Sequence, residues 1–206
     1  MTTTEVIDLF HLYSDNSTEL SDAEELALLN RAIRKLALDR PWEELKTEAT
    51  GAMSGTTIDL PADFGYLTEN YQDTDISIGQ GESVSKVVWI DNTSYRVVNF
   101  SDRKQYRTTS SVCYLDLANS QIVFPVEPSG TTYYFDYIKF PTDLTAGATI
   151  TWPKASFQPM LAHIMAIDAE IMEKFPRANS YAGDNQAKYQ SYLRDMAYIN
   201  SQYRAE

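Results

Sequence analysis

Cysteine and histidine are scarce in this sequence, whose 206 residues include one cysteine and two histidines. The single thiol, Cys113, cannot form an internal disulfide, which is typical of a protein made in a reducing compartment. Only His11 and His163 have side chains that ordinarily titrate near neutral pH and could act as general bases or metal ligands. We therefore expect no disulfide scaffold, no histidine-rich metal site and no cofactor.

Positive charge is also scarce, because 17 Lys and Arg residues accompany 29 Asp and Glu residues and leave a net charge of −12. Nucleic-acid binders gain affinity by replacing condensed counterions with Lys and Arg. The densest basic run, residues 102–107, holds three cations beside one acid. It is typical of a solvated surface turn, with a nucleic-acid contact as the alternative. We expect no sequence-specific DNA binding.

Long hydrophobic runs are absent, since no apolar stretch approaches the roughly 20 residues that cross a bilayer. Residues 1–6 lack the basic and then apolar segments of a signal peptide. We therefore expect no membrane contact, and a protein that stays in a cytoplasm-like compartment unless it leaves inside an assembled particle.

Catalytic motifs are missing as well. Residues 79–83 lack the lysine and the third glycine of a phosphate-binding loop, and the sequence contains no Gly-x-Ser-x-Gly and no Cys-x-x-Cys. His163 and Asp168 are five residues apart, which turns their side chains away from each other on a helix. Cys113 has no neighbouring histidine or cation and is interpreted as a small core residue. These absences predict that the chain is not an enzyme.

Paired carboxylates remain the one enzymatic alternative, because two acids across a cleft can cleave sugars. Five acids lie in loops of the central region: Asp59, Asp63, Asp73, Asp75 and Asp91. With 29 acidic residues in the chain, such proximity in sequence is expected by chance. The sequence cannot place any two of them across a cleft.

Helical spacing of apolar residues predicts helices near both ends of the chain. Ser21 and Glu24 form a capping-box pattern, and Pro41 lies beyond the end of the helix that follows. The apolar face of this helix comprises Leu26, Leu29, Ile33 and Leu36. A carboxyl-terminal helix is predicted from Phe157 or Gln158 to about Pro176. After a polar turn at residues 179–185, another helix carries Tyr189, Tyr192, Leu193, Met196, Ala197 and Tyr203.

The central region is rich in Thr, Val, Tyr and Ile and breaks into short runs, which is typical of β structure. We predict strands at residues 45–53, 56–60, 75–78, 85–91, 95–98, 113–117, 121–124, 132–139 and 149–151. Turn-forming residues at 92–94, 118–120 and 128–130 predict that most neighbouring strands pair as antiparallel hairpins. Alternation along residues 133–140 places Tyr133, Phe135 and Tyr137 on one face and Tyr134 and Ile138 on the other, so this strand is predicted to be central and buried.

The predicted fold class is therefore α+β. Residues 1–44 and 152–206 are expected to form a discontinuous helical bundle, and residues 45–151 an inserted antiparallel β-sandwich or barrel module. Two packed layers around one core are the usual solution for elements of both kinds.

The order of these pieces resembles that of bacteriophage head-to-tail adaptors, including the tail tubular protein A family of short-tailed phages. The first half carries LNRAI at residues 29–33, Trp42 and DLPADF at 59–64. The second half carries QIVFPVEP at 121–128, YYFDYIKFPTDL at 133–144, Trp152-Pro153 and closing helices. The resemblance covers residues 20–203 and consists of spaced apolar, proline and aromatic residues.

This resemblance implies a structural virion protein of the neck or tail, assembled in the host cytoplasm. It implies a homo-oligomeric ring, commonly of twelve copies, between the portal protein and a tail tube or nozzle protein, with DNA passing through the lumen. An acidic lumen would repel phosphates. The aromatic carboxyl terminus is the expected contact with the portal or a neighbouring subunit, through Tyr189, Tyr192, Tyr198 and Tyr203.

Two alternatives remain open. The extension before Ser21 and the compact β module also fit another neck component, such as a head-closure stopper. The aromatic strand at residues 133–140 also fits a non-viral carbohydrate- or protein-binding β module, because exposed tyrosines stack on sugar rings.

Overall fold

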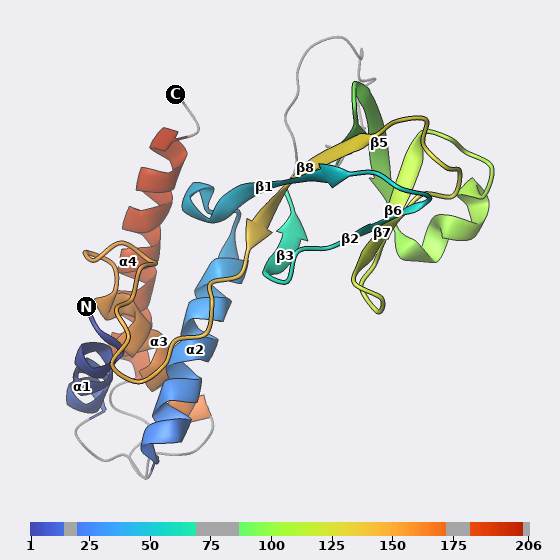
Figure 1. The fold of residues 1–206 in the computed structure, drawn as a ribbon. Coiled ribbons are helices and arrows are strands. Elements are labelled where there is room, and N and C mark those ends of the chain that lie inside the picture. Colours follow the sequence, from blue (N-terminus) through green and yellow to red (C-terminus); the bar gives the residue numbers. More distant parts are fainter. Residues whose placement is uncertain (15–19, 69–86, 172–181, 204–206) are drawn as a thin grey trace. The chain divides into compact units, whose positions relative to one another are not determined.

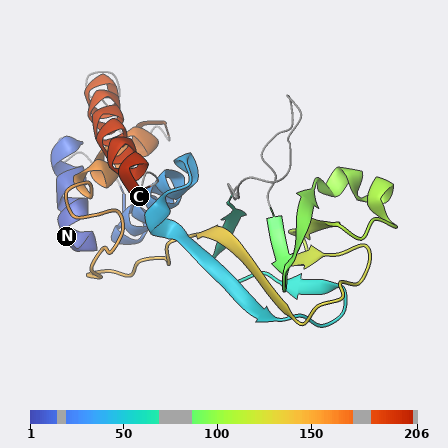
Figure 2. The same cartoon turned by 90° about the horizontal axis from the view of Figure 1, so that it is seen from above.

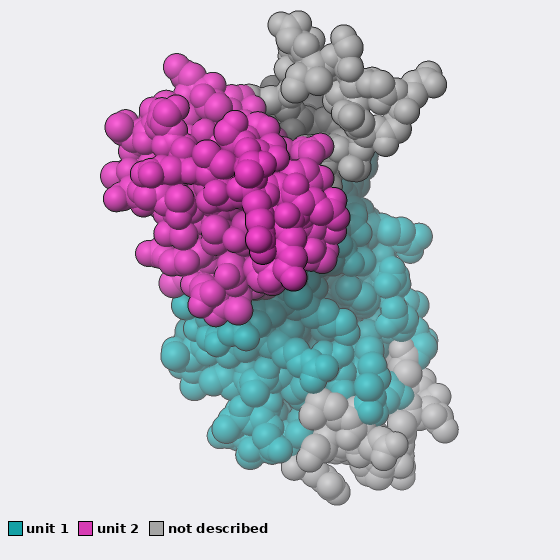
Figure 3. All heavy atoms as spheres, turned by 90° about the vertical axis from the view of Figure 1, so that its right-hand side faces the viewer, with its two compact units in different colours: residues 1–43, 141–206 teal, residues 44–140 magenta. Residues whose placement is uncertain are grey.

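A computed structural model describes residues 1–14, 20–68, 87–171 and 182–203. The chain divides into a helical unit, Met1–Glu43 with Pro141–Glu206, and a β-rich unit, Glu44–Phe140 (Figure 3). The predicted α+β class is confirmed. Among the described helices, none is long and apolar enough to cross a membrane.

The helical unit is organised around α3 (Pro159–Ile171), which contacts α1 (Thr3–Tyr13), α2 (Asp22–Asp39) and α4 (Ala182–Tyr203) (Figure 1). Most α3 residues are buried. A helix that packs against three neighbours needs apolar or small residues around most of its circumference, and the sequence of α3 meets this requirement.

Local signals set the starts of the first two helices. The Glu24 carboxylate accepts hydrogen bonds from the backbone N–H and the hydroxyl of Ser21, each 2.8 Å long, which confirms Ser21 as the N-cap of α2. Thr2 and Glu5 form a capping box at the start of α1. The sequence prediction began its first helix at Ser21 and missed α1, although the Thr-x-x-Glu pattern was present.

A long connection, residues 141–158, is fixed to the helices by side-chain hydrogen bonds. Asn30 exchanges two hydrogen bonds with the backbone of Leu144, and the Thr3 hydroxyl bonds the backbone at residues 145 and 147. The buried Gln158 side chain donates to the carbonyls of residues 150 and 153. The strand predicted at 149–151 is wrong, because this segment makes only the isolated bridge Thr2↔Thr149 among the described residues.

The predicted polar turn at 179–185 is also wrong in its second half. Residues 182–185 already belong to α4, and Asn185 is buried there. Residues 179–181 lie outside the described residues.

The β-rich unit forms one eight-stranded sheet with the path β1-β8-β4-β5-β6-β7-β2, and β3 pairs with β8. The strands are β1 (Lys46–Ala52), β2 (Thr57–Asp59), β3 (Phe64–Leu67), β4 (Val87–Ile90), β5 (Thr93–Val98), β6 (Val112–Asp116), β7 (Gln121–Val123) and β8 (Thr132–Lys139). A short 3₁₀ helix, η1 (Glu43–Leu45), directly precedes β1. A second one, η2 (Phe100–Tyr106), links β5 to β6.

The sheet is curled. Its path ends at β1 and β2, yet only four residues, 53–56, join these two strands in the chain. Four residues span at most about 18 Å, whereas seven strands laid flat would cover roughly 28 Å between the first and the last. The end strands must therefore approach each other. In Figure 2, β1 and β8 run as a long neighbouring pair, and the shorter strands turn away from their far end.

Strand pairing differs from the prediction in several respects. Among the described strands only β4–β5 and β6–β7 form antiparallel hairpins, so the prediction that most neighbouring strands do so is wrong. β5 and β6 pair in parallel through η2, so the module is not purely antiparallel. β7 and β8 do not pair, so residues 128–130 are a connection and not a hairpin turn. β3 was not predicted at all. The predicted strand at 75–78 and residues 85–86 lie outside the described residues, whereas the hairpin turn at 118–120 is confirmed.

The core of the β-rich unit lies on one face of this sheet. The central position of the aromatic strand is confirmed, because β8 pairs with β1, β3 and β4. Its residues Tyr133, Phe135 and Tyr137 face the core cluster. On the opposite face Tyr134 stacks on Trp89, with ring centroids 5.9 Å apart. The alternation predicted from sequence is therefore confirmed.

Candidate functional site

Three of the five carboxylates considered for catalysis lie in the described residues and are engaged in local structure, and Asp59 among them belongs to β2 and not to a loop. Asp59 accepts a 2.8 Å hydrogen bond from Gln121, and Asp63 accepts one of 2.8 Å from the Tyr137 hydroxyl. Asp91 accepts from the backbone N–H groups of residues 131 and 132, and so holds the β4–β5 turn to the start of β8. Asp73, Asp75 and residues 79–83 lie outside the described residues.

Burial and hydrogen bonding raise the pKa of Tyr137 to about 12, with desolvation as the larger cause and the bond to Asp63 as the smaller one. A phenol with so high a pKa stays protonated and donates to Asp63 throughout the physiological range. The pair therefore fixes the Asp63 loop against β8 and offers no general base.

Cys113 is fully buried in the core of the β-rich unit, and burial raises the pKa of its thiol well above the usual range. A thiol held in its neutral form is a poor nucleophile. In the part of the chain that the structure describes, no three His, Cys, Asp or Glu side chains gather into a metal-binding group.

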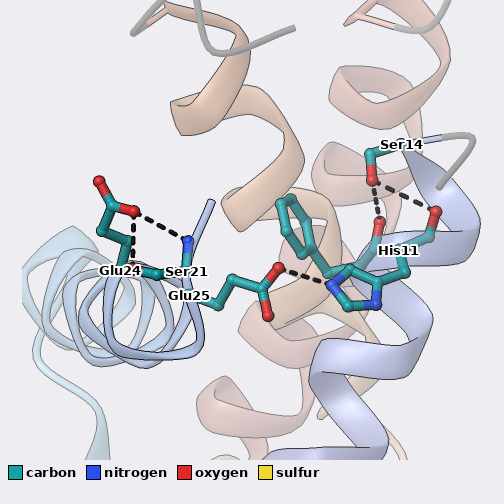
Figure 4. Close-up of polar contacts among 6 residues, drawn as sticks. His11, Ser14, Ser21, Glu24 and Glu25 are labelled. Carbon is teal, nitrogen blue, oxygen red and sulfur yellow. Dashed lines mark hydrogen bonds and ion pairs between the residues drawn. The ribbon is translucent and has the colours of Figure 1, made fainter. Parts of the chain in front are cut away.

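His11 joins α1 to α2, with its Nε2 atom 2.6 Å from Oε1 of Glu25 (Figure 4). The Glu25 carboxylate is nearly buried, whereas the imidazole is one-third exposed. The two residues lie on different helices, so no spacing rule could have predicted this contact. Its geometry ties the end of α1 to the start of α2.

His163 lies on α3, and its ring packs between tyrosines of α1 and α4. Its ring stacks on Tyr13 at 4.2 Å between centroids and 4° between planes, and Tyr192 lies at 6.1 Å. Nδ1 is 2.8 Å from Oδ1 of Asn185, so the neutral imidazole donates there. Burial, together with the nearby positive charge of Lys188, lowers the pKa of His163, although the bond to Asn185 partly opposes this.

The lowered pKa of His163 predicts a loss of stability in mild acid. The unfolded chain binds the proton near pH 6.5 while the folded chain does not, so the free energy of unfolding falls as pH drops below about 6.5. We expect His163→Gln to remove part of the fall seen between pH 7.5 and 5 in urea-unfolding curves.

Asn185→Asp supplies a sharper control for the same group, because a carboxylate beside the ring favours the imidazolium. It should raise the pKa of His163, followed by NMR of the two histidine rings, and weaken the acid-induced loss of stability. Parallel pH profiles for the wild type and His163→Gln would contradict the assignment.

Asp168 bonds to side chains of α2 rather than to His163, as the spacing of the two residues along the helix predicted. It is 4% exposed, and Oδ1 accepts a 2.8 Å hydrogen bond from Lys35 of α2. Arg31 lies 3.5 Å from Oδ2, an atom with no hydrogen-bond partner among the described residues. The two cations compensate a buried charge, so this group positions α2 against α3.

The four tyrosines expected at an assembly contact occupy different environments on α4. Tyr189 is 8% exposed and packs inside the helical unit, and burial raises its pKa. Tyr192 is half-buried beside His163. Tyr198 is 68% exposed, and Tyr203 is the last residue of the helix. Tyr198 is thus the member of this set that the isolated chain presents to solvent among the side chains described.

No curated protein matches the chain. The family model of the SU10 adaptor proteins, by contrast, matches residues 1–206. This match confirms the prediction of a phage adaptor protein and implies a structural, non-enzymatic role in the virion neck; it does not confirm the narrower resemblance to the tail tubular protein A family. The chain belongs to the SU10 adaptor protein family.

Proposed function

We propose that this protein forms the head-to-tail adaptor ring that joins the portal to the tail and surrounds the DNA exit channel. The observation that carries the proposal is the adaptor family match along the whole chain. A closed ring of one chain needs two different complementary surfaces on every copy.

Peptide mass spectrometry on gradient-purified, nuclease-treated particles tests this function. We expect one copy of this chain per portal subunit, which for a twelvefold portal means a dodecamer. Absence from particles would refute the proposal.

Position in the particle separates the adaptor from the alternative of a head-closure stopper. An adaptor ring contacts the portal directly, whereas a stopper lies further down the neck. Density for this chain between the portal and the next ring in a particle reconstruction would support the adaptor, and density below another neck ring would favour the stopper.

We propose Tyr198 as the carboxyl-terminal contact with the portal or a neighbouring subunit. Its ring is 68% exposed, so Tyr198→Ala should leave the free energy of unfolding within about 0.5 kcal/mol of the wild type while reducing incorporation into particles severalfold. Leu117→Ala is a matched control, because Leu117 is 67% exposed and lies on the β6–β7 turn. Equal incorporation of the two variants would contradict the proposed contact.

Deletion of residues 189–206 is a poor test of docking. It removes Tyr189, Leu193 and Met196, which are all buried in the helical unit. Loss of particle incorporation by such a truncation would report unfolding as much as a lost contact, so the point substitution is preferred.

The net charge of −12 supports a further part of this proposal, namely that acidic side chains line the lumen and let duplex DNA slide without adhering. A ring whose lumen is basic and whose acids face outward would contradict it.

One observation favours a carbohydrate-binding module as a second candidate. Trp89 and Tyr134 form a half-exposed stacked pair on the face of the sheet opposite the core, with ring planes 2° apart. Binding on a glycan array that is lost in Tyr134→Ala would support this candidate, and no binding would remove it.

A further inference from the structure

Some of the described Lys and Arg side chains form ion pairs with carboxylates, and others do not. Five of them form ion pairs with carboxylates: Arg31, Arg34, Lys35, Arg40 and Lys46. No ion pair within the described part of the chain involves Arg103, Lys104 or Arg107, which lie in and directly after η2. Other described cations, such as Arg96 and Arg194, also form no ion pair, but these three lie within five residues of one another.

The segment that carries these cations, residues 100–107, is called here the η2 knob. Arg103 is held in place, since its guanidinium lies 3.7 Å from the centroid of the Phe100 ring and donates a 2.6 Å hydrogen bond to the Phe100 carbonyl. Phe100 in turn packs edge-on against Tyr114 of β6, at 5.7 Å between centroids. The knob is therefore anchored to the sheet before any partner binds, which lowers the entropy cost of binding.

The outer side of the knob has the composition of an interface. Phe100 is 44% exposed, and Lys104 and Arg107 are exposed. An apolar ring beside a stacked guanidinium and two exposed cations suits a partner surface that offers carboxylates around a small apolar patch.

We propose that the η2 knob docks on an acidic surface of a second copy of this chain. The knob has a net charge of +2 on a chain whose total is −12, so the rest of each copy carries a net −14 and attracts it. Such a contact joins two different surfaces and repeats from copy to copy, as a closed ring requires. The inference rests on the proposed ring and names one of its subunit contacts.

Zero-length crosslinking of the full chain tests this contact. Equal amounts of unlabelled and ¹⁵N-labelled protein are treated with a carbodiimide, which joins a lysine amine directly to a touching carboxylate. We expect Lys104 to be linked to carboxylates of chains carrying the other isotope. Because salt screens exposed charges, these links should fall about tenfold between 50 and 500 mM NaCl.

Two neutralising substitutions that retain Lys104 sharpen the test. Arg107→Gln should reduce the inter-chain links from Lys104 severalfold. Arg194→Gln removes one exposed cation from α4 and is the matched control, with links equal to those of the wild type. Inter-chain links that are absent, or that are equal in the two variants, would overturn the inference.

Duplex DNA is the competing partner for three cations. Retention of labelled duplex by the wild type that falls in Arg107→Gln, without inter-chain links from Lys104, would assign the knob to phosphate contacts and overturn the inference. The particle copy number is an independent readout. Parity with the portal without links from Lys104 removes this inference alone, whereas absence from particles removes the ring.

Discussion

Replacing Trp42 with alanine is expected to lower the free energy of unfolding of the helical unit by about 3–5 kcal/mol. The Trp42 side chain is 1% exposed, and its ring lies 6.3 Å from that of Trp152. Its Nε1–H donates a 2.7 Å hydrogen bond to the carbonyl of Leu36 near the end of α2. Removal of the indole leaves a large cavity and an unpaired buried carbonyl.

Phenylalanine substitutions separate the packing contribution from the hydrogen bond. Trp42→Phe keeps most of the apolar volume but leaves the Leu36 carbonyl without its donor, which should cost about 1–2 kcal/mol. Trp152→Phe is the matched control, because Trp152 is 8% exposed and its Nε1–H has no hydrogen-bond partner among the described residues. Since it removes an unsatisfied donor, Trp152→Phe should be less destabilising than Trp42→Phe.

Urea unfolding followed by far-UV circular dichroism measures these differences. Equal losses in the two phenylalanine variants would show that the Trp42 hydrogen bond contributes nothing beyond packing. A loss below about 1.5 kcal/mol for Trp42→Ala would contradict the central packing role assigned to this side chain.

Local signals in the sequence were sufficient for α2 and for the alternation along β8. A side-chain cap and an apolar face repeat over a few residues, so they can be read without knowledge of the partner. The α2 prediction still misplaced part of the apolar face: Leu26 is half-buried, whereas Leu28, which was not named, is 5% exposed. α2 contacts both α1 and α3, so its buried face is wider than one stripe.

Strand pairing could not be predicted in the same way. The turn residues at 92–94 and 118–120 do lie near antiparallel hairpins, since contacts between neighbours in sequence are local. The parallel pairing of β5 with β6 depends instead on η2, whose sequence suggested a surface turn. Likewise, β3 has only four residues and is held in the sheet by pairing with residues 137–139 of β8.

The side-chain pairs of the helical unit were also beyond sequence reasoning. His11 with Glu25, His163 with Asn185 and Asp168 with Lys35 each join different helices. Sequence spacing could state that His163 and Asp168 do not meet, but not which groups they meet instead. That the sequence holds no recognisable catalytic motif could be established without a structure, because such motifs span only a few residues. The adaptor family match separately implies a structural role.

Glycine positions in the β-rich unit yield the second large expected effect. A Cβ atom added at Gly65 in β3 would lie 2.6 Å from the backbone carbonyl oxygen of Ile138 in β8, at the irregularity where the β3–β8 register shifts. A backbone oxygen in a central strand cannot move without disturbing its neighbours. We expect Gly65→Ala to lower the free energy of unfolding by about 2–3 kcal/mol.

Gly51→Ala is a matched control in the same sheet. A Cβ atom there would lie 2.8 Å from the Tyr133 hydroxyl, which is the far end of a side chain that can rotate away. The expected cost is about 1 kcal/mol or less, because only a rotamer must change. Hydrogen exchange of β8 amides, measured by mass spectrometry, should increase at residues 137–139 in Gly65→Ala and stay near wild type in Gly51→Ala. Equal destabilisation by both substitutions would mean that β3 can shift along β8, and the close backbone approach at Gly65 would then not fix the register of this strand.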